Sequence, residues 1–257
     1  IYTKEQITDA INLHKNGGDP YSIVPSKDTN GHGTAMAGIT SAKGYGLIKG
    51  GAPNSDIVVV KMREISAELR EYLDFNLDNG PVFDEVSLYL AVNYLKQLKF
   101  KYNKPMVVLI PVQTNGGDHC GNTILEDQIT KYSENIGFVV VAPAGNQANE
   151  QIHATGTFRD INKSGLIEMF VDKGQRRIRV DLYLENVGRA SIRIVSPSGE
   201  NTHNFSIRFG TAYNFKFLFE GTILELIYRN DSNPMKLIQH VELLFKDLTP
   251  GIRQIII

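Results

Sequence analysis

The 257-residue sequence has one cysteine, no tryptophan, almost no net charge and no long apolar run. The single cysteine, Cys120, excludes an internal disulfide and fits a reducing compartment or a bacterial protein. A formal net charge of −1 gives no electrostatic reason to expect nucleic acid or an anionic membrane as a partner. We find no signal peptide, and no apolar run approaches the ~20 residues of a membrane span. What remains is an ordinary globular composition, long enough for one large domain or two smaller ones.

The first part of the chain has the hydrophobic periods of alternating helices and strands. Thr3 and Gln6 form a capping-box pair at the start of a helical pattern. Short apolar runs typical of buried parallel strands cover residues 57–60, 106–110 and 138–141, and helical spacing covers 83–98 and 124–136. This order predicts a three-layer α/β fold, in which helices cover both faces of a parallel sheet. Ligand-binding sites in such folds lie beyond the carboxyl ends of the strands.

After about residue 156 the hydrophobic period changes to two. Ile178, Val180, Leu182 and Leu184 alternate with Arg177, Arg179, Asp181 and Tyr183, and further short alternating runs follow between turn signals. We therefore predict two domains, an α/β domain over residues 1–156 and an antiparallel β-sandwich or jelly roll over residues 157–257. The basic residues 176, 177 and 179 are expected to form a solvated strand face.

The most specific motif is Asp28-Thr29-Asn30-Gly31-His32-Gly33-Thr34-Ala35, which is followed by Ala37-Gly38. It resembles the histidine motif of the subtilisin-like serine peptidases, or subtilases. The resemblance implies that His32 opens a helix and acts as the general base and acid of a catalytic triad. The alternative is a histidine that only caps a turn at the start of a helix.

A second segment, Val141-Ala142-Pro143-Ala144-Gly145-Asn146, is similar to the subtilase segment that carries the oxyanion-hole asparagine. On this resemblance Asn146 donates its side-chain amide to the developing oxyanion, a role worth about 2.7–4 kcal/mol. The alternative is a loop asparagine that tolerates a left-handed backbone.

A β-sandwich that follows the asparagine narrows the resemblance to the clostridial spore-germination (Csp-type) subtilases, which have a jelly roll inserted into the protease domain. The matching stretches are residues 1–7, 28–38, 51–61 and 114–119. This resemblance implies a bacterial, spore-associated protein. The organism and the compartment themselves are not given by the sequence.

The triad aspartate and serine motifs of the subtilases are missing. No D-[ST]-G precedes His32, no G-T-S occurs anywhere, and Asp28 is too close in sequence to serve as a triad aspartate on a separate strand. A histidine without a nucleophile has no hydroxyl to deprotonate, so this chain should not cleave peptides by itself. The first residue is Ile1 rather than methionine, which fits a piece of a longer protein that carries both segments.

The stretch Val112, Gln113, Thr114 and Asn115 corresponds to the edge that pairs with the substrate backbone in subtilases, so we expect these residues to bind substrate. It departs from the family, which commonly has Ser-Leu-Gly where this chain has Pro111, Val112 and Gln113. Proline has no N–H to donate, and glutamine adds bulk where glycine leaves room. These changes favour a pseudoprotease, a member that has lost catalysis.

No cofactor or metal is expected. Asp118, His119 and Cys120 are adjacent and cannot all reach one ion from an extended segment, whereas a structural zinc site needs four spaced ligands.

Three functions stay open. The chain is the central part of a serine endopeptidase that acts on protein or peptide substrates, or a pseudoprotease that serves as a protein-binding or signalling scaffold. Its partners would include the missing subtilase segments or a propeptide. A carbohydrate-binding sandwich is the third option, although tryptophan, the usual sugar platform, is absent.

Overall fold

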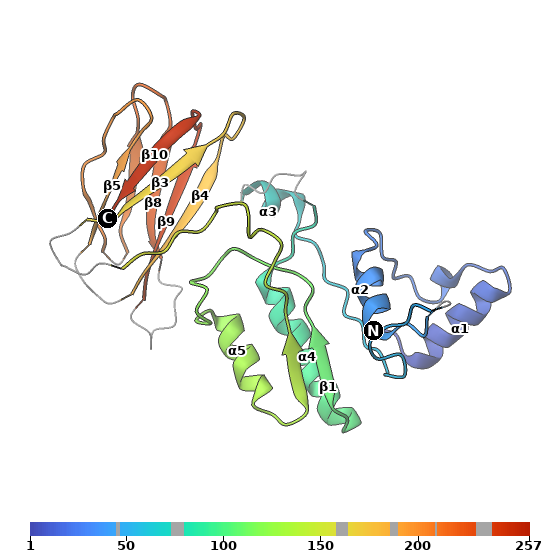
Figure 1. Cartoon of the computed structure of the whole chain (residues 1–257). Helices are drawn as coiled ribbons and strands as arrows, with labels where there is room; N and C mark the ends of the chain where they lie inside the picture. The colour runs from blue at the N-terminus through green and yellow to red at the C-terminus, as the bar shows by residue number, and fades with distance from the viewer. Residues whose placement is uncertain (45–46, 73–79, 158–163, 186–189, 209, 230–237) are drawn as a thin grey trace. The chain divides into compact units, whose positions relative to one another are not determined.

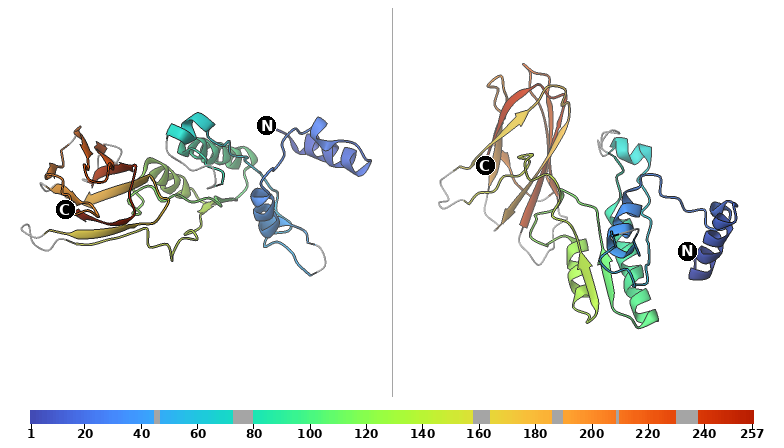
Figure 2. Two further views of the ribbon diagram at one scale, coloured as in Figure 1. Left: turned by 90° about the horizontal axis from the view of Figure 1, so that it is seen from above. Right: turned by 45° about the vertical axis from the view of Figure 1, so that its right-hand side comes forward.

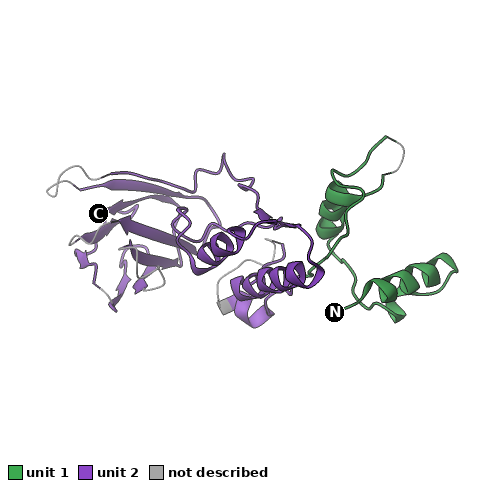
Figure 3. Ribbon diagram, turned by 90° about the horizontal axis from the view of Figure 1, so that it is seen from below, with its two compact units in different colours: residues 1–61 green, residues 62–257 purple. Residues whose placement is uncertain are grey.

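The computed structural model describes residues 1–44, 47–72, 80–157, 164–185, 190–208, 210–229 and 238–257. The chain divides into two compact units, residues 1–61 and residues 62–257 (Figure 3). The first unit is mainly helical, and the second contains an α/β part and a β-sandwich part (Figure 1).

The first unit contains helix α1 (Lys4–Lys15), the 3-10 helix η1 (Pro20–Ser22) and helix α2 (His32–Ser41). Helix α1 begins with the predicted capping box, because the Thr3 N–H donates to Gln6 Oε1 at 2.8 Å and the Gln6 N–H donates to Thr3 Oγ1 at 3.4 Å. Both orphan donors at the helix start are thus satisfied by side chains.

The strand predicted over residues 57–60 is wrong. The first unit has no strand among its described residues, and the apolar side chains of this run are exposed, Val59 by 74%. A run of this composition forms a strand only where a neighbouring strand satisfies its backbone groups. The described part of this unit offers no such neighbour.

The second unit begins with helix α3 (Ala67–Tyr72) and continues with α4 (Glu85–Tyr102), strand β1 (Met106–Leu109), helix α5 (Ile124–Ser133) and strand β2 (Phe138–Val141). Strands β1 and β2 pair in parallel, with Met106 opposite Phe138 and Leu109 opposite Val141. Buried residues of both helices and both strands form one core: Val92, Val108, Ile110, Tyr132 and Phe138. These elements confirm the α/β pattern expected from the sequence.

Among the described residues of the second unit, side chains cover one face of this small sheet and leave the other exposed. Val107 is 71% exposed and Val139 51% exposed, and these two residues are paired neighbours on the face away from α4 and α5. Parallel sheets are normally covered on both faces. The described residues of this unit therefore supply two of the three predicted layers.

The rest of the second unit forms two four-stranded antiparallel sheets. One sheet has the order β3-β10-β5-β6 and the other β4-β9-β8-β7. The strands are β3 (Leu166–Val171), β4 (Ile178–Glu185), β5 (Ser191–Val195), β6 (Phe205–Ser206), β7 (Ala212–Lys216), β8 (Ile223–Arg229), β9 (Ile238–Lys246) and β10 (Gly251–Ile256). Figure 2 shows these strands gathered into one body.

A single apolar core joins the two antiparallel sheets. It contains Ile192, Ile194 and Ile255 from one sheet and Leu224, Val241, Leu243 and Phe245 from the other. The alternation predicted for residues 178–184 is confirmed, because Leu182 is buried in this core while Arg179 on the same strand is exposed. Within the described ranges, none of the helices combines the length and the hydropathy needed to cross a bilayer.

Candidate functional site

His32 is the first residue of helix α2, as the sequence predicts. The turn before it depends on Gly31, whose φ of +88° lies in the left-handed region that glycine adopts without steric cost. Gly31 has no side chain with which to cap the helix. A residue that precedes Gly31 in the sequence supplies the cap instead.

The cap of α2 is the carboxylate of Asp28. Its Oδ1 accepts the N–H groups of Asn30 at 3.0 Å and Gly31 at 2.8 Å, and its Oδ2 accepts the Thr34 N–H at 2.9 Å and the Thr34 hydroxyl at 2.6 Å. These bonds favour the ionised form, so the Thr34 hydroxyl and then the Gly31 N–H hold the pKa of Asp28 well below its usual range. Asp28 thus positions the helix start that carries His32.

This role of Asp28 was missed at the sequence level, where the residue was considered only as a triad member. The usual sequence signal was lacking, because a capping aspartate is expected at the N-cap position, where this chain has Gly31. Among the residues that the structure describes, no carboxylate is hydrogen-bonded to the His32 imidazole.

The other predicted residues lie where the chain leaves β1 and β2. The pairing of these strands continues for one more step, because the Ile110 N–H donates to the Val141 carbonyl oxygen at 2.9 Å. Beyond this point, Gln113 Oε1 accepts the Asn146 N–H at 3.2 Å, and Asn115 Nδ2 donates to Gln147 Oε1 at 2.9 Å. Two side-chain bonds therefore tie the segment after β1 to the segment after β2.

The structure gives the four predicted substrate-binding residues different surroundings. Val112 packs against the α/β core, whereas Gln113, Thr114 and Asn115 are exposed. Thr114 Oγ1 accepts the Gly116 N–H at 3.0 Å and so shapes the following turn. Gln113 and Asn115 are brought together with the Asn146 segment at one edge of the sheet. His32 belongs to the other unit, so its predicted pairing with Asn146 stays a prediction.

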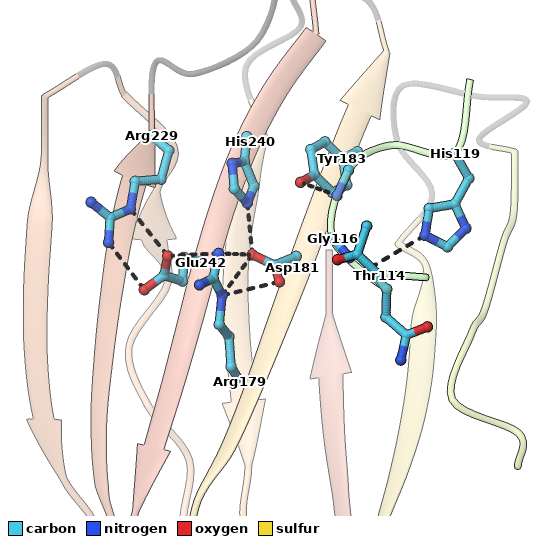
Figure 4. Close-up of polar contacts among 11 residues, drawn as sticks. Thr114, Gly116, His119, Arg179, Asp181, Tyr183, Arg229, His240 and Glu242 are labelled. Atoms are coloured by element: carbon cyan, nitrogen blue, oxygen red, sulfur yellow. Dashed lines mark hydrogen bonds and ion pairs between the residues drawn. The ribbon is translucent and has the colours of Figure 1, made fainter. Parts of the chain in front are cut away.

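The loop after Asn115 is also held from the β-sandwich, through residues that the sequence did not single out (Figure 4). The Gly117 N–H donates to the hydroxyl oxygen of Tyr183 in β4 at 3.2 Å. The Tyr183 ring stacks on the ring of His240 in β9, with centroids 4.4 Å apart. The partners Gly117 and Tyr183 are 66 residues apart, so local patterns could not have joined them.

His240 is buried and is fixed in turn by a charged cluster on β4, β8 and β9. Its Nε2 donates to Asp181 Oδ1 at 2.8 Å, Arg179 contacts both Asp181 and Glu242, and Arg229 contacts Glu242 at 3.1 Å (Figure 4). Burial by itself raises the pKa of Asp181, but the bonds from His240 and Arg179 outweigh it and hold the pKa below its ordinary value. The cluster holds His240, whose ring stacks on Tyr183, and Tyr183 in turn binds the loop at Gly117.

Asp118, His119 and Cys120 make their contacts within the loop itself. Asp118 accepts the Cys120 N–H at 3.0 Å and the side-chain amide of Asn122. His119 Nε2 lies 3.3 Å from the Asn115 carbonyl oxygen and donates to it in the tautomer that is protonated at Nε2, and the His119 ring stacks on His153 with centroids 5.3 Å apart. In the described ranges of the chain, no three histidine, cysteine, aspartate or glutamate side chains converge as metal ligands would.

Comparison with known proteins finds similarity to the subtilases. Residues 3–76 match the sequence model of the subtilase family. No curated protein sequence matches. Among solved structures, the chain is similar to the CspB protease of Clostridium perfringens, with 25% sequence identity and a TM-score of 0.79, over 99% of this chain and 51% of that one. The chain thus spans about half the length of the protease that it matches. The chain is therefore similar to the subtilases over residues 3–76 and to the CspB protease in its fold, which is the resemblance that the histidine motif predicts.

Proposed function

We propose that this chain is the central part of a serine endopeptidase of the CspB kind, in which His32 is the catalytic base and Asn146 an oxyanion donor. The observation that carries the proposal is His32 at the start of α2, inside the segment that matches the subtilase family. The resemblance to the CspB protease supports a protein or peptide substrate and a role in spore germination.

The proposed chemistry divides among three groups. The His32 imidazole takes the proton of a serine hydroxyl as the hydroxyl attacks the peptide carbonyl, and later returns it to the leaving amine. The Asn146 amide stabilises the negative charge on the carbonyl oxygen. The sequence holds no serine or aspartate motif of the family. The chain alone therefore does not cleave peptides, and the missing segments or a propeptide are its partners.

A pseudoprotease that works as a binding scaffold is the second candidate. One observation favours it, the Gln113 side chain that lies against Gly145 beside the proposed oxyanion donor. A side chain in this place competes with a substrate, whereas a scaffold does not need an open cleft.

Fluorophosphonate labelling separates the two candidates, because this probe reacts with a serine that a histidine has activated. The longer protein that carries this chain should be labelled, its His32→Ala variant should lose the label, and its His14→Ala variant should keep it. His14 is an exposed histidine in α1 and serves as the matched control. A longer protein that stays unlabelled in all three forms is a scaffold.

A further inference from the structure

We propose that a pocket beside helix α3 binds a carboxylate ligand, which Arg70 holds through its guanidinium group. The pocket has a volume of about 360 Å³ and is lined by Glu64, Ile65, Ala67, Arg70 and Gly80. None of these residues belongs to the proposed peptidase site. The inference therefore goes beyond the proposed function and can be tested without any proteolysis.

Two segments that pair with each other frame the pocket. The Ile65 N–H donates to the Val82 carbonyl oxygen at 3.0 Å, and Glu64 lies opposite Phe83 in an isolated antiparallel bridge. Helix α3 follows the first of these segments and carries Arg70 (Figure 1). Backbone bonds therefore hold the wall that contains Glu64 and Ile65, so a ligand does not have to order this wall when it binds.

Arg70 is buried, and few of its donors are used. The residue is 7% exposed, and its Nη1 donates to the Gly80 carbonyl oxygen at 2.9 Å. Its Nη2 lies 3.9 Å from Glu64 Oε2, which is too far for a hydrogen bond. A guanidinium group has five N–H donors, and the described residues of the chain supply Arg70 with this one acceptor. Because Arg70 lines the pocket, its other donors are available to a ligand there.

The surroundings of Arg70 select the kind of ligand. The planar guanidinium group binds a carboxylate or a phosphate through two parallel N–H donors. Glu64 lines the same pocket, and its negative charge opposes a phosphate more than a carboxylate, since phosphate carries the larger charge near neutral pH. Ile65 and Ala67 add apolar surface for a short aliphatic group. These residues together fit a small carboxylate with one negative charge.

Isothermal titration calorimetry of the folded chain tests the proposal with three probes. N-acetylalanine carries the carboxylate of a peptide C-terminus, N-acetylaspartate α-amide carries that of an acidic side chain, and N-acetylalanine amide carries none. At least one carboxylate should bind, and the neutral amide should not. In Arg70→Lys the affinity should fall about tenfold or more, because lysine cannot bind a carboxylate through two parallel donors. Arg63→Lys is the matched control at an exposed arginine outside the pocket lining, and it should bind as the wild type does.

A second pair of variants keeps the proposal testable if Arg70→Lys does not fold. Glu64→Gln removes the opposing charge, so it should raise the affinity for the carboxylate about two- to fivefold. Glu68→Gln, at an exposed glutamate of α3 outside the lining, should leave the affinity unchanged. The proposal is overturned if neither carboxylate binds the folded chain, if inorganic phosphate binds more tightly than both, or if binding is the same in Glu64→Gln and Glu68→Gln.

Discussion

Asp28 shows how one side chain replaces a missing cap. It accepts bonds from three backbone N–H groups and one hydroxyl, whereas the N-cap residue Gly31 offers no side chain. The left-handed turn at Gly31 and the carboxylate of Asp28 act together, since the turn aims the N–H groups that the carboxylate accepts. The Gly31 turn and the Asp28 carboxylate together fix the start of α2, and so the position of His32.

We predict that Asp28→Ala lowers the melting temperature and that Asp28→Asn lowers it less, because asparagine still accepts hydrogen bonds. The pKa of Asp28 is lower in the folded chain than in the unfolded chain. Its stabilising effect is therefore complete above the unfolded pKa of about 3.9 and is lost as the pH falls toward the lower folded pKa. Melting curves at pH 6 and near pH 2 should show a large and then a small difference between wild type and Asp28→Ala.

The β-sandwich also contains a buried ion pair that depends on two single residues, Arg253 and Glu220. Arg253 is fully buried and donates to Glu220 at 2.8 Å, and the same carboxylate accepts the Thr249 hydroxyl at 2.9 Å and the Ser198 N–H at 2.8 Å. Removal of one partner from a buried pair leaves a charge without compensation, at a cost of about 3–5 kcal/mol.

We accordingly expect Glu220→Gln to lower the free energy of unfolding by about 3 kcal/mol in denaturant titration. Glu225→Gln is the control, because Glu225 pairs with Lys246 in a more exposed place where such pairs contribute about 1 kcal/mol or less. Equal effects of the two variants would contradict the account of the buried pair.

At the scale of elements, the loop after β1 is held from two sides. Gln113 and Asn115 bind the segment after β2, and Gly117 binds Tyr183 in β4. The loop is therefore a structural link between the α/β part and the sandwich of the second unit.

Tyr183→Phe should release this link without disturbing the core. The Gly117 N–H loses its acceptor, so its hydrogen exchange should be faster by about two- to tenfold, the effect of one hydrogen bond of modest net strength. Tyr213→Phe, which removes a bond to the Ser206 carbonyl oxygen elsewhere in the sandwich, should leave Gly117 unchanged. Unchanged exchange in Tyr183→Phe would show that the contact does not order the loop.

The elements also show what a sequence can predict. Local signals predicted α1 from Thr3 and Gln6, and short apolar runs predicted β1 and β2. The run at residues 57–60 has the same composition but forms no strand, because pairing depends on a neighbour rather than on the run itself. The bonds Gln113–Asn146 and Gly117–Tyr183 join distant residues, and no local pattern reports them.

At the scale of the whole molecule, the two cores of the second unit have separate members. One is built from residues between 88 and 140, and the other from residues between 167 and 257. The domain boundary predicted at residues 156 and 157 separates these cores, although the compact units divide at residue 61. We propose a domain boundary between residues 156 and 157 because it separates the two apolar cores.

Residues 157–257 should accordingly fold alone. Their core contains residues of both sheets and needs no side chain from the α/β part. The expressed segment should show a strand-rich circular dichroism spectrum and one cooperative unfolding transition. A segment that stays unfolded would place the boundary elsewhere.

The central claim is that His32 and Asn146 serve one active site, although they belong to separate units of this chain. A crystal structure of the longer protein, with a peptidyl phosphonate bound, measures this directly. The account predicts that the His32 imidazole and the Asn146 side-chain amide flank the inhibitor within about 12 Å of each other, the reach of two hydrogen bonds and a reacting carbonyl. The two side chains at opposite edges of the sheet would contradict it.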